Sequence, residues 1–228
     1  MTKPQSAQDQ DKDKNKRDDK RPVPRLYLVT PIIEDAVAFS GTLRDALAAA
    51  DVAAVLLRLK PAGERDLINR IKVLAPVVQE KDIALLLDGL PELVARAGAD
   101  GAHLTGIEAF MAAVDSLKPA KIAGCGGVNS RDDTMLAGER GADYVMMGHI
   151  AAELRRPPFD AIVERVEWWS KLFTVPCVGF AASLMEIAPL SAAGADFVAV
   201  GEAVWNDPRG ALTALAEASR LLAPEPVC

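Results

Sequence analysis

From Arg25 onward, short apolar runs alternate with longer segments of helical periodicity, the pattern of parallel strands joined by helices. Eight runs are predicted as strands: 25–30, 53–59, 83–88, 101–104, 121–126, 144–148, 176–180 and 197–201. Segments with apolar residues at helical spacing follow them: 35–50, 64–81, 91–98, 106–117, 130–141, 159–172, 183–194 and 211–222. Eight such units favour a single (βα)8 TIM barrel. The alternative, a doubly wound open sheet, lacks the expected Gly-x-Gly-x-x-Gly after the first strand.

A short repeat, Gly-Ala-Asp, precedes three of the predicted strands, at 98–100, 141–143 and 194–196. Glycine suits the left-handed conformation just beyond a helix end, and Asp is common in turns. We therefore expect the repeat to serve the scaffold and to carry no chemistry.

Residues 1–24 contain almost no large apolar side chain and mix Lys and Arg with Asp. Such a segment cannot recover the entropy lost on ordering. We predict a disordered, solubilising arm over 1–24 and one domain over 25–228. A tail that binds a partner is the alternative.

Composition narrows the class of protein. A net charge of −6 gives no basic face for nucleic acid, and no apolar run reaches the ~18 residues of a membrane span. The cysteines, Cys125, Cys177 and Cys228, have no Cys-x-x-Cys spacing, and no signal sequence is evident. We expect a cytoplasmic protein with reduced thiols and neither nucleic-acid nor membrane partners.

Polar residues at the carboxyl ends of barrel strands surround the active site of a TIM barrel. On the second predicted strand, alternation places Leu56, Arg58 and Lys60 on the inner face, while the residues between them face the helices. Two cations at one mouth suit a phosphate or diphosphate, so we expect a small phosphorylated metabolite. Ion pairs with acidic neighbours are the alternative.

Two carboxylates follow neighbouring strands: Asp88 ends the third and Glu108 follows the fourth. Together they are predicted to hold Mg²⁺ against phosphate oxygens. Structural roles in a turn and at a helix start are the alternatives.

Both histidines fall near the same end of the barrel. His149, beyond the sixth strand, is a candidate acid, base or hydrogen-bond donor, whereas His103 is either a ligand contact or a core residue. Cys125 ends the fifth strand, and a buried inert thiol is favoured there over a substrate contact.

These motifs resemble those of the thiamine-phosphate synthase and thiazole tautomerase (TenI-like) superfamily over residues 25–222. The Gln-x-Arg-x-Lys of that family aligns with Leu56, Arg58 and Lys60, and its Asn-Asp aligns with Leu87-Asp88. Its Gly-(Val/Ile)-His-Leu-Gly-Gln-x-Asp and Gly-Ala-Asp-Tyr-(Val/Ile)-x-x-Gly-Pro segments resemble residues 101–108 and 141–149.

The departures from the family fall where it binds phosphates. Its Ser and His after the fifth strand are Gly126 and Val128 here. Its Thr-x-Thr-Lys loop becomes residues 151–156, in which Arg155 and Arg156 keep the positive charge.

The last two strands also depart from the family. The Gly-Gly after the seventh strand is Ala181-Ala182, and Glu202 follows Gly201 where this fold often offers helix amides to phosphate. A like-charge contact at ~4 Å costs on the order of 4 kcal/mol at an effective dielectric near 20. We therefore expect Glu202 to weaken a thiazole-phosphate site.

The resemblance implies a transferase that joins a pyrimidine methyl diphosphate to a thiazole phosphate and releases diphosphate. Arg58, Lys60 and Mg²⁺ on Asp88 and Glu108 would stabilise the leaving diphosphate, with an arginine of 155–156 as a clamp. The missing donors predict slow turnover or a changed substrate.

Two other functions remain open: a non-catalytic barrel that binds a metabolite or partner protein, and a tautomerase-like isomerase in which His149 or His103 moves a proton. Trp168, Trp169 and Phe173 either contact another chain in a homo-oligomer or pack on the barrel exterior.

Overall fold

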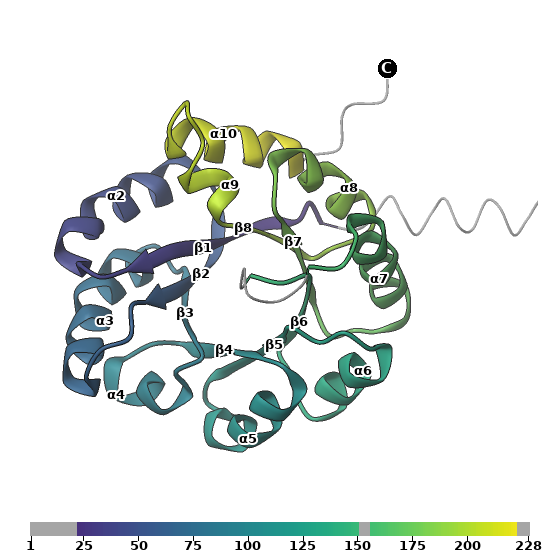
Figure 1. The fold of residues 1–228 in the computed structure, drawn as a ribbon, viewed down its shortest axis with the longest axis horizontal. Coiled ribbons are helices and arrows are strands. Elements are labelled where there is room, and N and C mark those ends of the chain that lie inside the picture. Colours follow the sequence, from purple (N-terminus) through teal and green to yellow (C-terminus); the bar gives the residue numbers. More distant parts are fainter. Residues whose placement is uncertain (1–21, 151–155, 223–228) are drawn as a thin grey trace, which may run out of the picture.

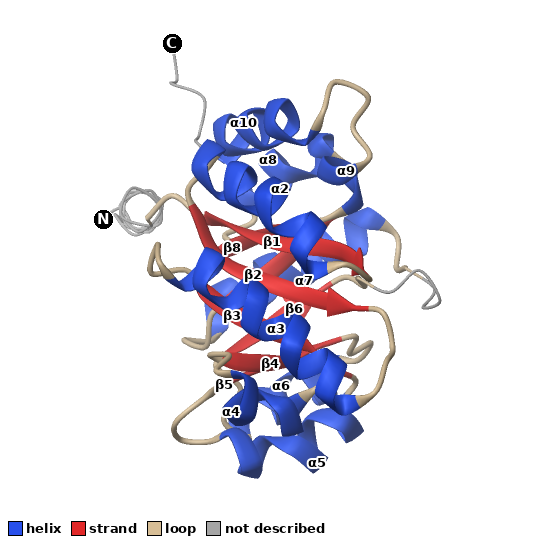
Figure 2. Cartoon of the chain, turned by 90° about the vertical axis from the view of Figure 1, so that its left-hand side faces the viewer, coloured by secondary structure: helices blue, strands red, loops and turns tan. Residues whose placement is uncertain are grey.

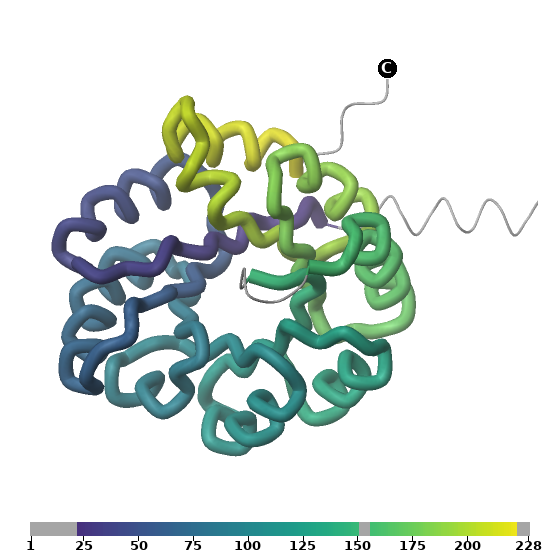
Figure 3. The backbone as a smooth tube through the Cα atoms, viewed as in Figure 1, coloured from purple at the N-terminus to yellow at the C-terminus, as the bar shows by residue number. Residues whose placement is uncertain are grey.

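Eight parallel strands form a closed barrel in the computed structural model, which describes residues 22–150 and 156–222 (Figures 1 and 3). Each strand pairs with the next along the chain, and the last pairs with the first. The strands are β1 (Arg25–Ile33), β2 (Val52–Leu59), β3 (Ala84–Asp88), β4 (Gly101–Thr105), β5 (Ile122–Gly126), β6 (Tyr144–Met147), β7 (Cys177–Ala181) and β8 (Phe197–Val200). All eight match predicted strands, so the TIM barrel is confirmed and the open-sheet alternative is wrong.

Helices surround this barrel, and the arrowheads of β1 and β2 point to one end, which we call the mouth (Figure 2). The helices are α2 (Ala36–Ala49), α3 (Glu64–Gln79), α4 (Val94–Ala97), α5 (Ile107–Leu117), α6 (Arg131–Glu139), α7 (Phe159–Leu172), α8 (Ile187–Ala192), α9 (Glu202–Trp205) and α10 (Ala211–Leu222). Short 3-10 turns, Pro91–Leu93 and Leu184–Glu186, lead into α4 and α8. Only α9 was not predicted, because four residues are too few to display helical periodicity.

Side-chain alternation divides the apolar residues into two layers. The larger layer fills the space between the sheet and the helices and includes Val55, Leu57 and Cys125. A smaller layer fills the barrel interior: Tyr27, Val29, Ala54, Leu56, Leu86, Tyr144, Met146, Val178, Phe180 and Ala199. Leu56 thus lies inside and its neighbours in sequence lie outside, as predicted for β2.

Glycines on β5 make room for two large rings inside the barrel. A Cβ added at Gly124 would lie 2.0 Å from the Tyr144 ring, and one at Gly126 would lie 2.6 Å from the His103 ring. The Tyr144 hydroxyl is 2.9 Å from Nδ1 of His103 and 2.8 Å from the Tyr27 hydroxyl. The interior therefore contains a buried chain of hydrogen-bonded rings that includes His103.

The Gly-Ala-Asp repeat closes the end of the barrel opposite the mouth. Its glycines have φ angles of 79°, 91° and 91°, as expected for helix ends. Each aspartate accepts the backbone N–H of a residue near the start of the preceding strand: Leu85 with Asp100, Ala123 with Asp143 and Cys177 with Asp196, each at 2.8 Å. The repeat is structural, as predicted. Asp51, before β2, instead accepts from the Arg25 side chain at 2.7 Å.

Several other sequence-based expectations concern the exterior. Residues 1–21 of the predicted arm and Cys228 lie outside the described residues, while Cys125 and Cys177 are buried. In the described part of the chain, every helix is too short or too polar to cross a membrane. The C-terminal half of α7 packs on the barrel, because the Trp169 ring is buried and stacks on Phe173 with centroids 4.1 Å apart.

The close packing at Gly124 predicts a large cost for a single methyl group there. We expect Gly124→Ala to lower the free energy of unfolding by about 1–3 kcal/mol, because Tyr144 must move. Gly41→Ala is the matched control: Gly41 lies within α2 with open space around its Cα, so this change should stabilise by up to about 1 kcal/mol. Denaturant unfolding of both variants checks this, and equal effects would contradict it.

Burial of His103 predicts sensitivity to acid. Burial lowers the pKa of His103 from 6.5 to about 4, so between these values the unfolded chain binds a proton that the folded chain does not. The free energy of unfolding should therefore fall by up to ~3 kcal/mol as pH drops from 6.5 to 4. Since carboxylates also titrate there, NMR titration of His103 is the deciding measurement. A pKa near 6.5 would refute this explanation.

Candidate active site

Arg58 and Asp88 meet at the mouth, at the ends of adjacent strands β2 and β3. Nε of Arg58 lies 3.5 Å from Oδ2 of Asp88, and both side chains are mostly buried. Burial raises the pKa of Asp88, while the Arg58 guanidinium opposes that rise. Nε of Arg58 has no hydrogen-bond partner among the described residues, so this pair is not fully satisfied.

Lys60, two residues beyond Arg58, forms an ion pair with an acidic neighbour. Its Nζ lies 2.8 Å from Oε2 of Glu34, and both side chains are more than half exposed. The ion-pair alternative therefore describes Lys60. An exposed pair of this kind contributes about 0–1 kcal/mol, so a stronger anion can displace Glu34.

The predicted magnesium ligands are unequal. Asp88 is mostly buried at the mouth, whereas Glu108 is exposed in the first turn of α5, where a carboxylate also favours the helix. Among the described residues, no group of three or more His, Cys, Asp or Glu could form a metal site. Mg²⁺ commonly uses one or two carboxylates together with substrate phosphates and water, and the poorly satisfied Asp88 fits that mode.

His149 follows β6 and is 6% exposed. Its Nε2 donates to Oδ1 of Asn129 at 3.1 Å, and Nδ1, the unprotonated nitrogen, has no partner among the described residues. Burial, followed by the charges of Arg165 and Arg156, lowers the pKa of His149. The ring is therefore a neutral acceptor, held by a loop whose carbonyls at Val128 and Asn129 accept from Arg165.

Cys125 is a candidate substrate contact that the structure removes from the mouth. The thiol belongs to the outer layer, because the inward positions of β5 are those of Gly124 and Gly126. Burial raises its pKa to about 12, which leaves the thiol protonated. The alternative of a buried inert thiol is therefore the one that the structure supports.

Arg156, just before α7, has an unexpected partner. Its guanidinium forms a two-pronged ion pair with Glu186 at 3.0 and 2.6 Å, and the same Glu186 carboxylate accepts the backbone N–H of Ala182 at 2.7 Å. Ala181 is buried at the end of β7. The Glu186 carboxylate thus already accepts from the Arg156 guanidinium and the Ala182 amide. Arg155 lies outside the described residues.

Glu186 was not predicted as a site residue, although it stands three residues after Ser183, the spacing of a capping box. Glu202, the acidic residue that the sequence predicted near the phosphate site, is exposed at the start of the four-residue helix α9. Gly201 packs against Val29 of β1: a Cβ added at Gly201 would lie 3.3 Å from the Cβ of Val29. The carboxylate that binds a loop amide is therefore the one after β7.

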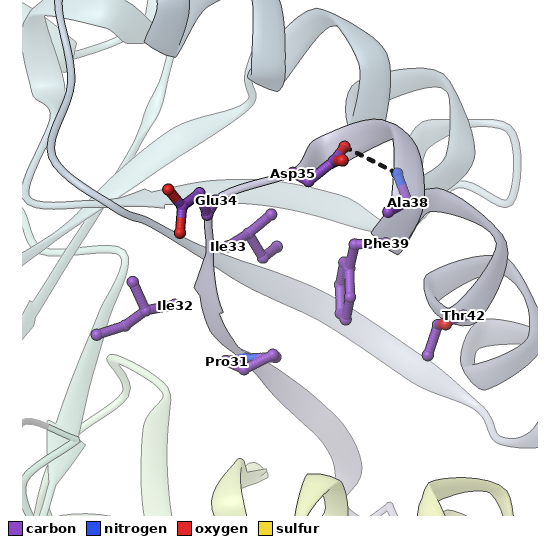
Figure 4. Close-up of a pocket in the computed structure, with 8 residues that line it drawn as sticks. All are labelled: Pro31, Ile32, Ile33, Glu34, Asp35, Ala38, Phe39 and Thr42. Atoms are coloured by element: carbon purple, nitrogen blue, oxygen red, sulfur yellow. Dashed lines mark hydrogen bonds between the residues drawn. The ribbon is translucent and has the colours of Figure 1, made fainter.

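A hollow of about 310 Å³ lies beside the end of β1 and the start of α2 (Figure 4). Its wall includes Ile33 and Phe39, and two carboxylates, Glu34 and Asp35, stand at its edge. Asp35 already accepts the first amides of α2, at Val37 and Ala38. This hollow is therefore unsuited to a phosphate.

The buried polar atoms without partners gather at the mouth. Four such atoms occur among the described residues, and three of them belong to residues at or beyond the carboxyl end of a strand. They are Nε of Arg58, in the last two residues of β2, and Nδ1 of His149 and Nε of Arg156, both between β6 and α7. Buried polar groups in native proteins are nearly always hydrogen-bonded. Unsatisfied atoms concentrated at one end therefore indicate a site shaped for a polar ligand.

Comparison with known proteins indicates the family of the chain. The family model described as "Thiamine monophosphate synthase" matches residues 26–204. Thiamine-phosphate synthase from Rhodospirillum centenum is 41% identical over 87% of this chain and 97% of its own length, and that from Hyphomonas neptunium is 38% identical over 86% and 92%.

Solved structures share the fold. Thiamine phosphate pyrophosphorylase from Pyrococcus furiosus superposes with a TM-score of 0.70 at 23% identity, covering 87% of this chain and 95% of its own. The 3-hexulose-6-phosphate synthase from Salmonella typhimurium gives 0.67 at 16%, covering 87% and 100%. The family match and the two close relatives show that this chain belongs to the thiamine monophosphate synthase family.

Proposed function

We propose that this chain is a thiamine-phosphate synthase, a transferase that joins a pyrimidine methyl diphosphate to a thiazole phosphate and releases diphosphate. The unsatisfied polar atoms at the mouth, on Arg58, His149 and Arg156, are the observation that carries this proposal. They offer two cationic donors and one neutral acceptor to a ligand that contains both phosphate and heterocyclic groups.

In this proposal Arg58 stabilises the departing diphosphate. When the bond between the pyrimidine methylene and the diphosphate oxygen breaks, negative charge grows on the leaving group, and the Arg58 guanidinium at the mouth stabilises that charge. Lys60 joins after leaving Glu34, its exposed partner. The thiazole nitrogen then forms the new bond to the methylene carbon.

Asp88 is proposed as the main protein ligand of Mg²⁺, with Glu108 reaching it from α5. When bound, Mg²⁺ would supply positive charge that stabilises the leaving diphosphate, and Asp88 would hold it there. The partly buried Asp88 carboxylate meanwhile keeps Arg58 at the mouth through their 3.5 Å contact. Asp88 and Glu108 are therefore the two carboxylates that this proposal assigns to Mg²⁺.

His149 and Arg156 are proposed to orient the second half of the ligand. Nδ1 of His149 accepts a hydrogen bond from a ligand donor, because its other nitrogen is held by Asn129. Arg156 binds phosphate only after releasing Glu186, which also occupies the Ala182 amide. That competition, together with the lost family donors, supports slow turnover or an altered substrate.

A tautomerase-like isomerisation is the second candidate. The neutral, buried His149 with an unpartnered Nδ1 favours it, because such a nitrogen can take a proton from a bound ring. Conversion of a thiazole carboxylate phosphate without any pyrimidine substrate would distinguish this reaction from the transferase reaction.

Arg58→Ala tests the transferase directly. With both thiamine precursors and Mg²⁺, we expect the variant to lose about 10²-fold or more in kcat/KM, because a donor to the leaving group is removed. Thiamine phosphate is measured by fluorescence after oxidation. Arg44→Ala, on the exposed surface of α2, is the control and should retain full activity. Equal activity of the two variants would contradict the role of Arg58, and inactive wild type that still binds a precursor would indicate a binding protein.

Glu186→Gln tests whether the internal carboxylate competes with phosphate. Removing its charge should lower KM for the thiazole phosphate by about tenfold, equivalent to about 1.4 kcal/mol, since Arg156 and the Ala182 amide lose a competing anion. Glu139→Gln, which removes an exposed carboxylate at the end of α6, is the matched control and should leave this KM unchanged. An unchanged or higher KM for Glu186→Gln would assign Glu186 to loop structure alone.

A further inference from the structure

Three ring side chains from three strands form a hydrogen-bonded chain inside the barrel. Tyr27 of β1 contacts Tyr144 of β6 through their hydroxyls at 2.8 Å, and the Tyr144 hydroxyl lies 2.9 Å from Nδ1 of His103 on β4. The three residues are 2%, 6% and 1% exposed. The Tyr144 ring also stacks on the imidazole with an interplanar angle of 13°. Neither ring can turn without disturbing the other.

Counting the protons gives this series of hydrogen bonds a direction. Each tyrosine hydroxyl has one proton to donate. If Tyr27 donates to Tyr144 and Tyr144 donates to His103, both protons are used and the chain ends on an unprotonated Nδ1. In the opposite direction, His103 donates to Tyr144 and Tyr144 donates to Tyr27, which leaves the Tyr27 proton without an acceptor among the described residues. The first direction leaves a different donor, Nε2–H of His103, without an acceptor among the described residues. That nitrogen lies beside Gly126 at the mouth end of β5, whereas Tyr27 is the third residue of β1, far from the mouth. Buried donors are rarely left unpaired, so the direction that leaves its free donor on the ligand side is favoured.

The imidazole is turned so that its other nitrogen is nearer the mouth. The Tyr144 ring lies against Gly124, whereas Cε1 and Nε2 of His103 lie against Gly126, where an added Cβ would be 2.7 Å from Nε2. Gly126 is the last residue of β5, two positions closer to the mouth than Gly124. The edge of the ring that carries Nε2 thus faces the ligand side of the barrel interior.

We propose that Tyr144, with Tyr27 behind it, is a positioning residue that fixes His103 as the Nε2–H tautomer, so that His103 offers an uncharged N–H donor to the ligand. The role toward ligand rests on the proposed function, whereas the tautomer does not. Burial lowers the pKa of His103 to about 4, which keeps the ring neutral near pH 7. An uncharged donor suits a neutral acceptor atom, such as a ring nitrogen of a heterocycle, while Arg58 serves the phosphates.

The tautomer can be measured directly because the chain contains only two histidines. In ¹⁵N-histidine-labelled protein, long-range ¹H–¹⁵N correlation spectra distinguish Nε2–H from Nδ1–H, and His149→Asn assigns the two rings. We expect Nε2–H for His103 in the wild type. Tyr144→Phe keeps the ring but removes the donor, and should convert His103 to a mixture of tautomers. Tyr27→Phe is the matched control: Tyr144 still donates, so the Nε2–H form should persist.

Steady-state kinetics supply the second measurement. Tyr144→Phe should raise KM for one of the two thiamine precursors by about tenfold, the value of one hydrogen bond, with kcat changed less than about twofold. Tyr27→Phe should change KM much less. A purely structural tyrosine would lower stability in both variants without this split between KM and kcat.

Defined results would overturn the inference. An Nδ1–H or doubly protonated His103 at pH 7 would refute the direction of the chain, even if Tyr144→Phe fails to fold. An unchanged tautomer in folded Tyr144→Phe would refute the positioning role. If wild type shows the predicted tautomer and its loss in Tyr144→Phe but makes no thiamine phosphate, the positioning role is supported and the proposed function fails.

Discussion

The limited volume inside an eight-stranded barrel is the constraint on which this structure depends. Such an interior is just wide enough to be filled by side chains. Here β5 contributes Gly124 and Gly126 to it, and the space that these residues leave is taken by Tyr144 and His103. The rings in turn determine which polar groups face one another below the mouth. The polar chemistry of the interior therefore follows from the absence of two side chains on one strand.

Charge at the mouth is arranged as pairs of unequal strength. Lys60 and Glu34 are exposed and weakly coupled, whereas Arg58 with Asp88 and Arg156 with Glu186 are mostly buried. Separating a buried pair without replacement is costly, but a phosphate that arrives as one carboxylate leaves keeps the arginine paired. In the proposed function, phosphate binding at Arg156 would therefore exchange one anion for another, and its affinity would depend on the difference between phosphate and the Glu186 carboxylate as partners of the same donors.

The sequence was sufficient for the fold because strand periodicity, helix periodicity and the Gly-Ala-Asp repeat all indicated the same alternation. It also placed Arg58 and Asp88 at one end, since parallel strands share a carboxyl edge. The ion-pair partner of Lys60 and the orientation of Cys125 did not follow from the sequence pattern. Lys60 is paired by Glu34, twenty-six residues away, and Cys125 lies outside because the inward positions of β5 are the glycines on either side of it. Such outcomes depend on register and loop path, which residue types do not encode locally.

Four aspartates at the far end of the barrel immediately precede the even-numbered strands: Asp51, Asp100, Asp143 and Asp196 precede β2, β4, β6 and β8. Each is bonded to the odd-numbered strand just before it, three through a backbone amide and Asp51 through the side chain of Arg25. The barrel is thus four versions of one strand-pair module, each with its own internal fastening.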